Sequence, residues 1–178
     1  MPSQDKERVM KKRAFFLGGT LAALAMFAAS PVTATPQSGM SSETLAKGVY
    51  APMNLGAAGD RNYDKDDKWD LKLMTKDVSD VYNVRNTFVP GGHSGWHTHP
   101  GPSLITITAG QITVYEDDGL CQGKTYNAGD GSLDLGSGHA HLIKNEGSVN
   151  AVTVVTQIIP HDAARRIDVD SVPTNCSF

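Results

Sequence analysis

The stretch that decides the fold is "GGHSGWHTHPGPSLITITAG", which runs from Gly91 to Gly110. Three of the six histidines of the chain stand within seven residues of it, and a run rich in β-branched residues follows them. His97 and His99 are two residues apart, so on a strand both side chains point to the same face. This spacing aims two imidazoles into one space and is typical of two ligands of one metal ion.

A third nitrogen ligand must come from elsewhere in the chain, and His141 is the best candidate. It lies in "GHAHLIKNEG", where it follows a glycine-rich turn and opens a second strand-like run. Spacing alone leaves open that the pair of histidines occupies an exposed loop and binds nothing. The sequence therefore predicts a site on His97, His99 and His141 only if the two strands come together.

The part of the chain after residue 68 has the pattern of an all-β domain. Short runs of β-branched and aromatic residues alternate with turns rich in Gly, Asn and Asp, which is typical of a sandwich or barrel. The predicted strands cover residues 69–74, 81–89, 104–108, 111–115, 132–135, 141–144 and 151–159. Residues 162–168 offer one helical turn at most. With 178 residues in all, we expect one domain over 67–178.

The first 34 residues have the pattern of a secretory signal peptide. Basic residues at 11–13 precede an apolar run over 14–29, and small residues follow at 32–34. Because the apolar run is too short for a comfortable membrane span, we favour cleavage over an uncleaved anchor. The protein is then periplasmic or secreted. Residues 35–66 lack apolar periodicity, so we expect a linker or loose N-terminal arm there.

The charge of the chain limits the partners that we expect, and its cysteine content bears on the cellular compartment. Five basic and two acidic residues lie in residues 1–34, so the remainder carries 11 basic and 17 acidic residues, a net charge of −6. An acidic domain is unsuited to nucleic acid or to anionic membranes, and we expect neither as a partner. Cys121 and Cys176 are the two cysteines of the chain. In an oxidising compartment they are expected to form a disulfide, although two free thiols remain the alternative.

Together these residues resemble the two sequence motifs of the cupin superfamily. Gly91, His97, His99 and Gly110 match the first motif, while Ser103 stands where the family has a glutamate ligand. The second motif is similar to the pattern made by four residues, namely Gly129, Gly138, His141 and Asn145. The spacing in the second motif is one residue longer than usual, and the motif lacks its proline. The resemblance covers residues 69–160.

The resemblance implies a single antiparallel β-barrel, also called a double-stranded β-helix or jelly roll, closed around one pocket. It implies that His97, His99 and His141 converge on one divalent transition metal, which all-imidazole ligation suggests is zinc, iron, nickel, copper or manganese. With Ser103 in place of the glutamate, we expect three protein nitrogens plus water or substrate. Such a site retains the charge of the ion and favours an anionic ligand.

The leading functional hypothesis is a small metal-dependent enzyme that acts on a small organic acid or oxygenated compound. Dioxygenase, isomerase and lyase chemistry all fit, and cupin barrels host many activities. The alternative is a non-catalytic module that binds a small ligand or the metal. It is favoured by the lack of a clear general base beside the ligands. Cupins often pair through sheet edges, so a homodimer is expected on the resemblance.

Other residues are weaker candidates for the pocket. Ser103, Ile105 and Ile107 share a strand face and predict a largely apolar wall beyond the metal. His93 is a rim acid or base, an extra metal ligand, or a solvated loop residue. We interpret the remaining candidates as structural, exposed or in loops, with Asn145 bracing the barrel: they are Tyr115, Glu116, Tyr126, His139, Asn145 and His161.

Overall fold

A computed structural model gives the structure of residues 36–58, 70–169 and 176 of this protein. Within those residues the regular structure consists of twelve β-strands. The described residues include no helix long and apolar enough to cross a membrane. The predicted signal peptide, residues 1–34, lies outside the described part. The strands are β1 (Ser38–Tyr50), β2 (Asn54–Ala58), β3 (Asp70–Met74), β4 (Ser79–His93), β5 (His97–Thr98), β6 (Ser103–Ala109), β7 (Gln111–Glu116), β8 (Lys124–Asn127), β9 (Gly131–Asp134), β10 (His141–Lys144), β11 (Ala151–Pro160) and β12 (Ile167–Asp168).

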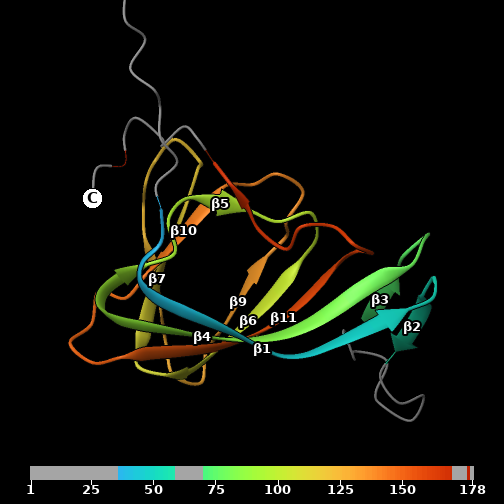
Figure 1. Cartoon of the computed structure of the whole chain (residues 1–178), viewed down its shortest axis with the longest axis horizontal. Helices are drawn as coiled ribbons and strands as arrows, with labels where there is room; N and C mark the ends of the chain where they lie inside the picture. The colour runs from blue at the N-terminus through green and yellow to red at the C-terminus, as the bar shows by residue number, and fades with distance from the viewer. Residues whose placement is uncertain (1–35, 59–69, 170–175, 177–178) are drawn as a thin grey trace, which may run out of the picture. The chain divides into compact units, whose positions relative to one another are not determined.

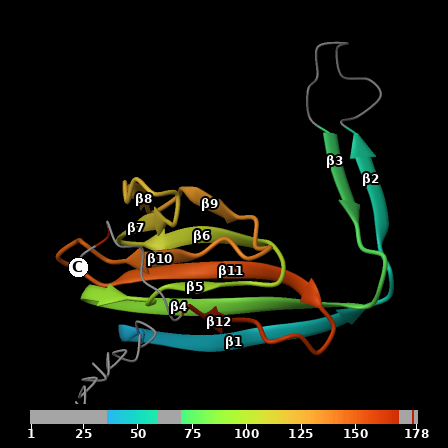
Figure 2. The same ribbon diagram turned by 90° about the horizontal axis from the view of Figure 1, so that it is seen from above.

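Ten of these strands form one antiparallel sheet that curls into a nearly closed barrel (Figure 1). The main path runs β12-β5-β10-β4-β11-β6-β9, with β1 added beside β4, β7 beside β10 and β8 beside β7. The strands β2 and β3 form a separate two-stranded sheet (Figure 2). The predicted all-β class and the single antiparallel barrel are thereby confirmed.

The prediction of a loose arm over residues 35–66 was wrong for two segments, which form β1 and β2. Strand β1 pairs with β4 over its whole length, from Tyr50 opposite Ser79 to Ser38 opposite His93. Nearly every side chain of β1 is exposed. It is therefore held by backbone hydrogen bonds to β4, and it lacks the apolar alternation by which a half-buried strand is recognised.

All seven predicted strands are present, with ends that shift by up to four residues. The prediction missed β5, β8 and β12, which are only two to four residues long. Residues 162–166 form turns and a loop before β12, and no helical turn. A strand of two residues carries no readable period, and only its neighbours in the sheet define it.

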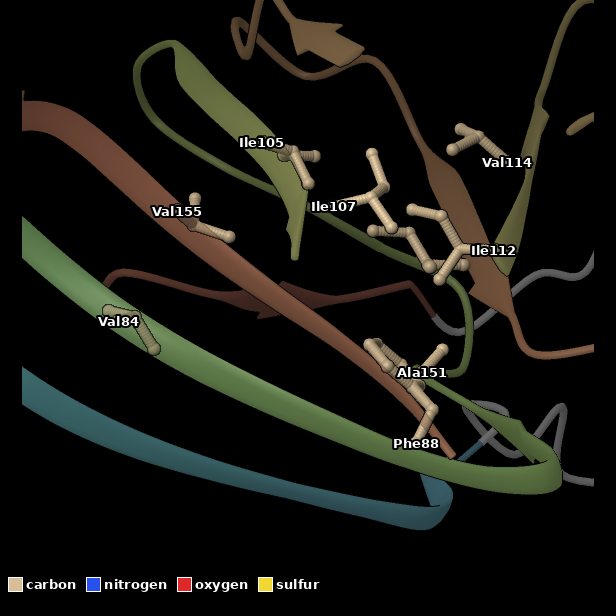
Figure 3. Packing of buried hydrophobic residues seen from close by; sticks show 9 residues of the cluster. Val84, Phe88, Ile105, Ile107, Ile112, Val114, Ala151 and Val155 are labelled. Carbon is tan, nitrogen blue, oxygen red and sulfur yellow. The ribbon is translucent and has the colours of Figure 1, made fainter. Parts of the chain in front are cut away.

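The barrel core is built by alternate residues of strands that face one another. Strand β11 alternates buried and half-buried positions from Ala151 to Ile159, and β6 alternates buried and exposed positions from Ser103. Figure 3 shows the main cluster, which comprises Val84, Phe88, Ile105, Ile107, Ile112, Val114, Ile143, Ala151 and Val155. Each large side chain buried this way contributes about 1.5–3 kcal/mol relative to an exposed one.

A second, smaller cluster lies behind the short strands β5 and β10. Trp96 and Leu142, both buried, pack there with Ala140 and Cys176. Cys176 forms the predicted disulfide with Cys121, with 5.4 Å between their Cα atoms. Because Trp96 directly precedes His97, this disulfide-linked cluster supports the back of the strand that carries the histidine pair.

Candidate metal centre

Strand pairing brings the three predicted histidines together. His97 on β5 lies directly opposite His141 on β10, and opposite residues of an antiparallel pair hold their side chains on one face. The ring centroids of His97 and His141 are 4.3 Å apart, and those of His97 and His99 are 4.8 Å apart. One nitrogen from each of the three rings can be chosen so that all lie within 4.8 Å of one another.

Backbone carbonyls orient the two rings of the His-x-His pair. Nδ1 of His97 donates to the carbonyl of Gly95 at 2.9 Å, and Nδ1 of His99 donates to the carbonyl of Arg165. A carbonyl oxygen only accepts, so Nδ1 carries the proton in both rings and Nε2 keeps its lone pair. Both rings are thus held in the tautomer that offers Nε2 to a metal ion.

The protonation of the three rings also fits metal binding. Burial above all, together with the nearby His141 and Arg166, lowers the pKa of His97 to about 2. Burial likewise lowers the pKa of His99 and that of His141. All three imidazoles are therefore neutral near pH 7, which is the form that coordinates a metal.

His141 supplies the strongest indication that a ligand belongs here. Its side chain is 5% exposed, and neither ring nitrogen has a hydrogen-bond partner among the described residues. Leaving such a buried polar atom unpaired costs about 1–3 kcal/mol. A cation shared with the two oriented rings would satisfy one of these nitrogens. The donor set of three neutral imidazoles suits a transition metal.

The three histidines face a cavity of about 230 Å³ inside the barrel. Ser103 and Ile105 line it as predicted, together with Val84, Ile143 and Val155. The prediction that Ile107 also lines this wall is not met, because Ile107 packs in the main core cluster. The apolar side chains therefore share the wall with polar ones, among them Asn86 and Gln157, so the prediction of a largely apolar wall is met only in part.

An acidic side chain that the sequence reading missed lies beside the histidines. Asp134 ends β9, where it pairs with Ser103 on β6. One carboxylate oxygen, Oδ2, is 3.9 Å from Nε2 of His99, and the other, Oδ1, is 3.9 Å from Nδ1 of His141. The sequence pattern that could have pointed to Asp134 is the alternation along β9, which places Asp134 and Ser132 on the same face of that strand. This pattern does not show which strand lies beside β9.

Two arginines that the sequence reading also missed line the cavity. Arg165 and Arg166 lie in the loop between β11 and β12. The guanidinium of Arg165 lies 5.2 Å from the ring centroid of Tyr82, and Nε of Arg166 donates to Asp168 at 2.6 Å. The carbonyl of Arg165 accepts from His99 and from Gln157, so this loop is tied to the centre. The cavity thus combines apolar and polar side chains with two guanidinium groups, of which that of Arg166 is paired with Asp168.

The weaker candidates lie outside the cavity, and several of them make hydrogen bonds within the scaffold. Asn145 is fully buried and donates to the carbonyls of Phe88 and Val149, which confirms its bracing role. The Tyr115 hydroxyl donates to Glu146 at 2.8 Å. His93 accepts from the backbone N–H of Gly95. None of the weaker candidates lines the cavity among the described residues; these are His93, Tyr115, Glu116, Tyr126, His139, Asn145 and His161.

Comparison with known proteins gives likeness at the level of fold. No family model matches the chain, and no curated protein matches it. An uncharacterised conserved protein with a double-stranded β-helix domain from Klebsiella pneumoniae is 19% identical, with 67% of this chain and 85% of that chain covered and a TM-score of 0.43. A cupin superfamily protein from Desulfitobacterium hafniense is 19% identical, with 45% and 68% covered and a TM-score of 0.39.

An oxalate oxidase is also among the similar structures. It is 25% identical, with 43% of this chain and 41% of that chain covered and a TM-score of 0.39. The chain therefore spans less than half the length of that oxidase. The structural neighbours thus include cupin superfamily proteins, the family that the sequence motifs resemble.

Proposed function

We propose that this protein is an exported metal-dependent cupin that acts on a small organic acid. The observation that carries the proposal is the convergence of three neutral imidazoles from two paired strands, with ligand atoms within 4.8 Å of one another. His97, His99 and His141 would hold one divalent transition metal. When bound, that metal would supply a Lewis acid that binds oxygen atoms of the substrate and stabilises negative charge developing on them.

The charge and shape of the cavity favour a small carboxylate as the ligand. The guanidinium groups of Arg165 and Arg166 can pair with a carboxylate group, and arginine does this with two parallel hydrogen bonds. The apolar side chains of Val84, Ile105 and Val155 face the rest of such a molecule. A volume of about 230 Å³ suits a compound of a few heavy atoms. Dioxygenase, isomerase or lyase chemistry fits this arrangement.

One observation favours a second function, in which the barrel binds a small acid or the metal without turnover. Among the described residues that line the cavity, none is a carboxylate; Asp134 stands beside the histidines but outside this lining, and each histidine belongs to the proposed metal centre. A proton transfer step would therefore lack an obvious base next to the substrate. A binding module needs no such base.

The two functions are separated by a turnover assay on metal-loaded protein. We would offer a panel of small mono- and dicarboxylic acids, follow dissolved oxygen with an electrode, and identify products by mass spectrometry. The enzyme hypothesis predicts turnover of at least one acid. His97→Ala should abolish this turnover, and Arg166→Gln should raise the KM for the acid. Saturable binding of an acid with no product under any metal would instead establish the binding module.

Export of the chain and its assembly into a homodimer are parts of the same proposal. The Cys121–Cys176 disulfide supports folding in an oxidising compartment. Cell fractionation, with N-terminal sequencing of the product, tests it: the proposal requires a periplasmic or secreted chain beginning near residue 35, and an intact cytoplasmic chain would contradict it. We further propose a homodimer, which light scattering of the purified protein distinguishes from a monomer.

A further inference from the structure

One oxygen of Asp134 is buried without a partner and lies beside the metal centre. The Asp134 side chain is 10% exposed. Its Oδ1 accepts a hydrogen bond from the backbone N–H of Gly136 at 2.9 Å, which fixes the carboxylate. Its Oδ2 is buried and has no hydrogen-bond partner among the described residues. A buried carboxylate oxygen without a donor is costly, and a cation bound beside it would remove that cost.

The distances suit coordination of one ion. Two ligand atoms that each lie about 2.0–2.2 Å from the same ion are separated by roughly 3–4 Å, depending on the angle between them. Oδ2 of Asp134 lies 3.9 Å from Nε2 of His99, the nitrogen that hydrogen bonding leaves free for the metal. The carboxylate stands beside His99 and His141 rather than within the group formed by all three rings. A small rotation of the side chain on metal binding would close that gap.

We propose that Asp134 is a fourth protein ligand of this metal, through Oδ2; the inference rests on the proposed three-histidine centre. Strand pairing places Asp134 directly across from Ser103, so an acidic ligand is delivered from β9 to the side of the site where β6 presents only a hydroxyl. The Oγ of Ser103 accepts a hydrogen bond from Gln157 at 3.2 Å, and a neutral hydroxyl is in any case a poor ligand for a divalent ion. The carboxylate cancels one of the two charges of the ion and adds a hard oxygen donor.

The test compares cobalt(II) binding by the metal-free protein and three variants. Cobalt(II) is the probe because its visible absorption changes with the number and type of its ligands. Asp134→Asn keeps an oxygen that accepts from Gly136 and so preserves the loop. Asp117→Asn removes an exposed carboxylate of the same charge and is the matched control. His97→Ala reports on the histidine centre itself, and circular dichroism verifies the fold of each variant.

We expect Asp134→Asn to weaken cobalt(II) binding by at least tenfold and to change the absorption spectrum, while Asp117→Asn changes neither. If Asp134→Asn gives the wild-type absorption spectrum, whether its cobalt(II) affinity is unchanged or reduced, the inference is overturned, because the carboxylate would then lie outside the coordination sphere. If His97→Ala also binds cobalt(II) like the wild type, the three-histidine centre itself is refuted. The failure of Asp134 and the failure of the whole site are therefore separate results.

Discussion

His97 and His141 stand directly opposite each other in the antiparallel pair of β5 and β10, with ring centroids 4.3 Å apart. They are 44 residues apart in the chain, and the register of two short strands alone brings them together. Because side chains alternate between the two faces of a strand, a slip of one residue would turn His141 away from His97. The centre thus depends on whatever holds these strands in place.

Reduction of the disulfide should destabilise the protein. Cys121–Cys176 closes a loop of 55 residues, for which the chain-entropy model gives about 4 kcal/mol. We expect a reducing agent to lower the urea midpoint of unfolding accordingly. Since Cys176 packs with Trp96 behind His97, metal affinity should fall as well. Cys121→Ser/Cys176→Ser should reproduce both effects without reductant, and unchanged midpoints in that variant would contradict this role.

The two faces of β6 should respond very differently to truncation. Ile107 is 1% exposed in the core cluster, whereas Leu104 on the same strand is 50% exposed. Ile107→Ala should cost about 2–5 kcal/mol through lost burial and the cavity left behind. Leu104→Ala should change the free energy of unfolding by less than about 0.5 kcal/mol. Urea titrations followed by circular dichroism measure both, and equal costs would mean that β6 is wrongly oriented.

An ion-pair cluster away from the metal centre should make stability depend on acid pH. Asp80 is fully buried, 2.9 Å from the Lys47 ammonium and 2.8 Å from Nδ1 of His161. Burial alone would raise the pKa of Asp80, but hydrogen bonds from Lys47 and His161 outweigh it and hold the pKa at about 2. The ordinary value is 3.8, so the folded state favours the ionised form.

The sign follows from this lowered pKa. The contribution of Asp80 is fully present above pH 3.8 and is lost as the pH falls through about 2. Asp80→Asn should therefore lower the urea midpoint most at neutral pH, and its gap to the wild type should shrink between pH 3.8 and 2. Asp117→Asn serves as the exposed control. A gap that stays constant down to pH 2 would show that Asp80 stabilises the fold by other means.

The position across from Asp134 offers a rescue experiment. Ser103 lines the cavity and pairs with Asp134 across β6 and β9. In an Asp134→Asn background, Ser103→Glu should recover metal affinity, because a carboxylate then reaches the same side of the centre from the neighbouring strand. Competition with a coloured chelator measures the affinity. Ser103→Gln in the same background supplies the shape without the charge and should recover much less.

The sequence was sufficient for features that are encoded locally. The spacing of His97 and His99, and the glycine-rich turn before His141, predicted three residues that the structure brings together. Alternation along residues 104–108 and 151–159 predicted the strands that build the core. Two cysteines in a chain expected to be exported predicted the disulfide.

What the sequence reading missed depends on partners distant in the chain. Strand β1 has an exposed surface and is defined by hydrogen bonds to β4, which no periodicity in residues 38–50 reveals. Asp134 acquires its position from the register of β9 against β6. Arg165 and Arg166 reach the cavity because the loop after β11 turns back and is tied by its carbonyl to His99. Each of these needs the sheet order before it can be placed.

Equilibrium dialysis of metal-free protein against a divalent transition metal tests the central claim most directly. The wild type should bind one ion per chain, and His97→Ala, His99→Ala and His141→Ala should each lose most of that binding. His139→Ala, which removes an exposed imidazole two residues from His141, should bind like the wild type. Full binding in all three triad variants, or equal losses in His139→Ala, would show that the three imidazoles do not share an ion.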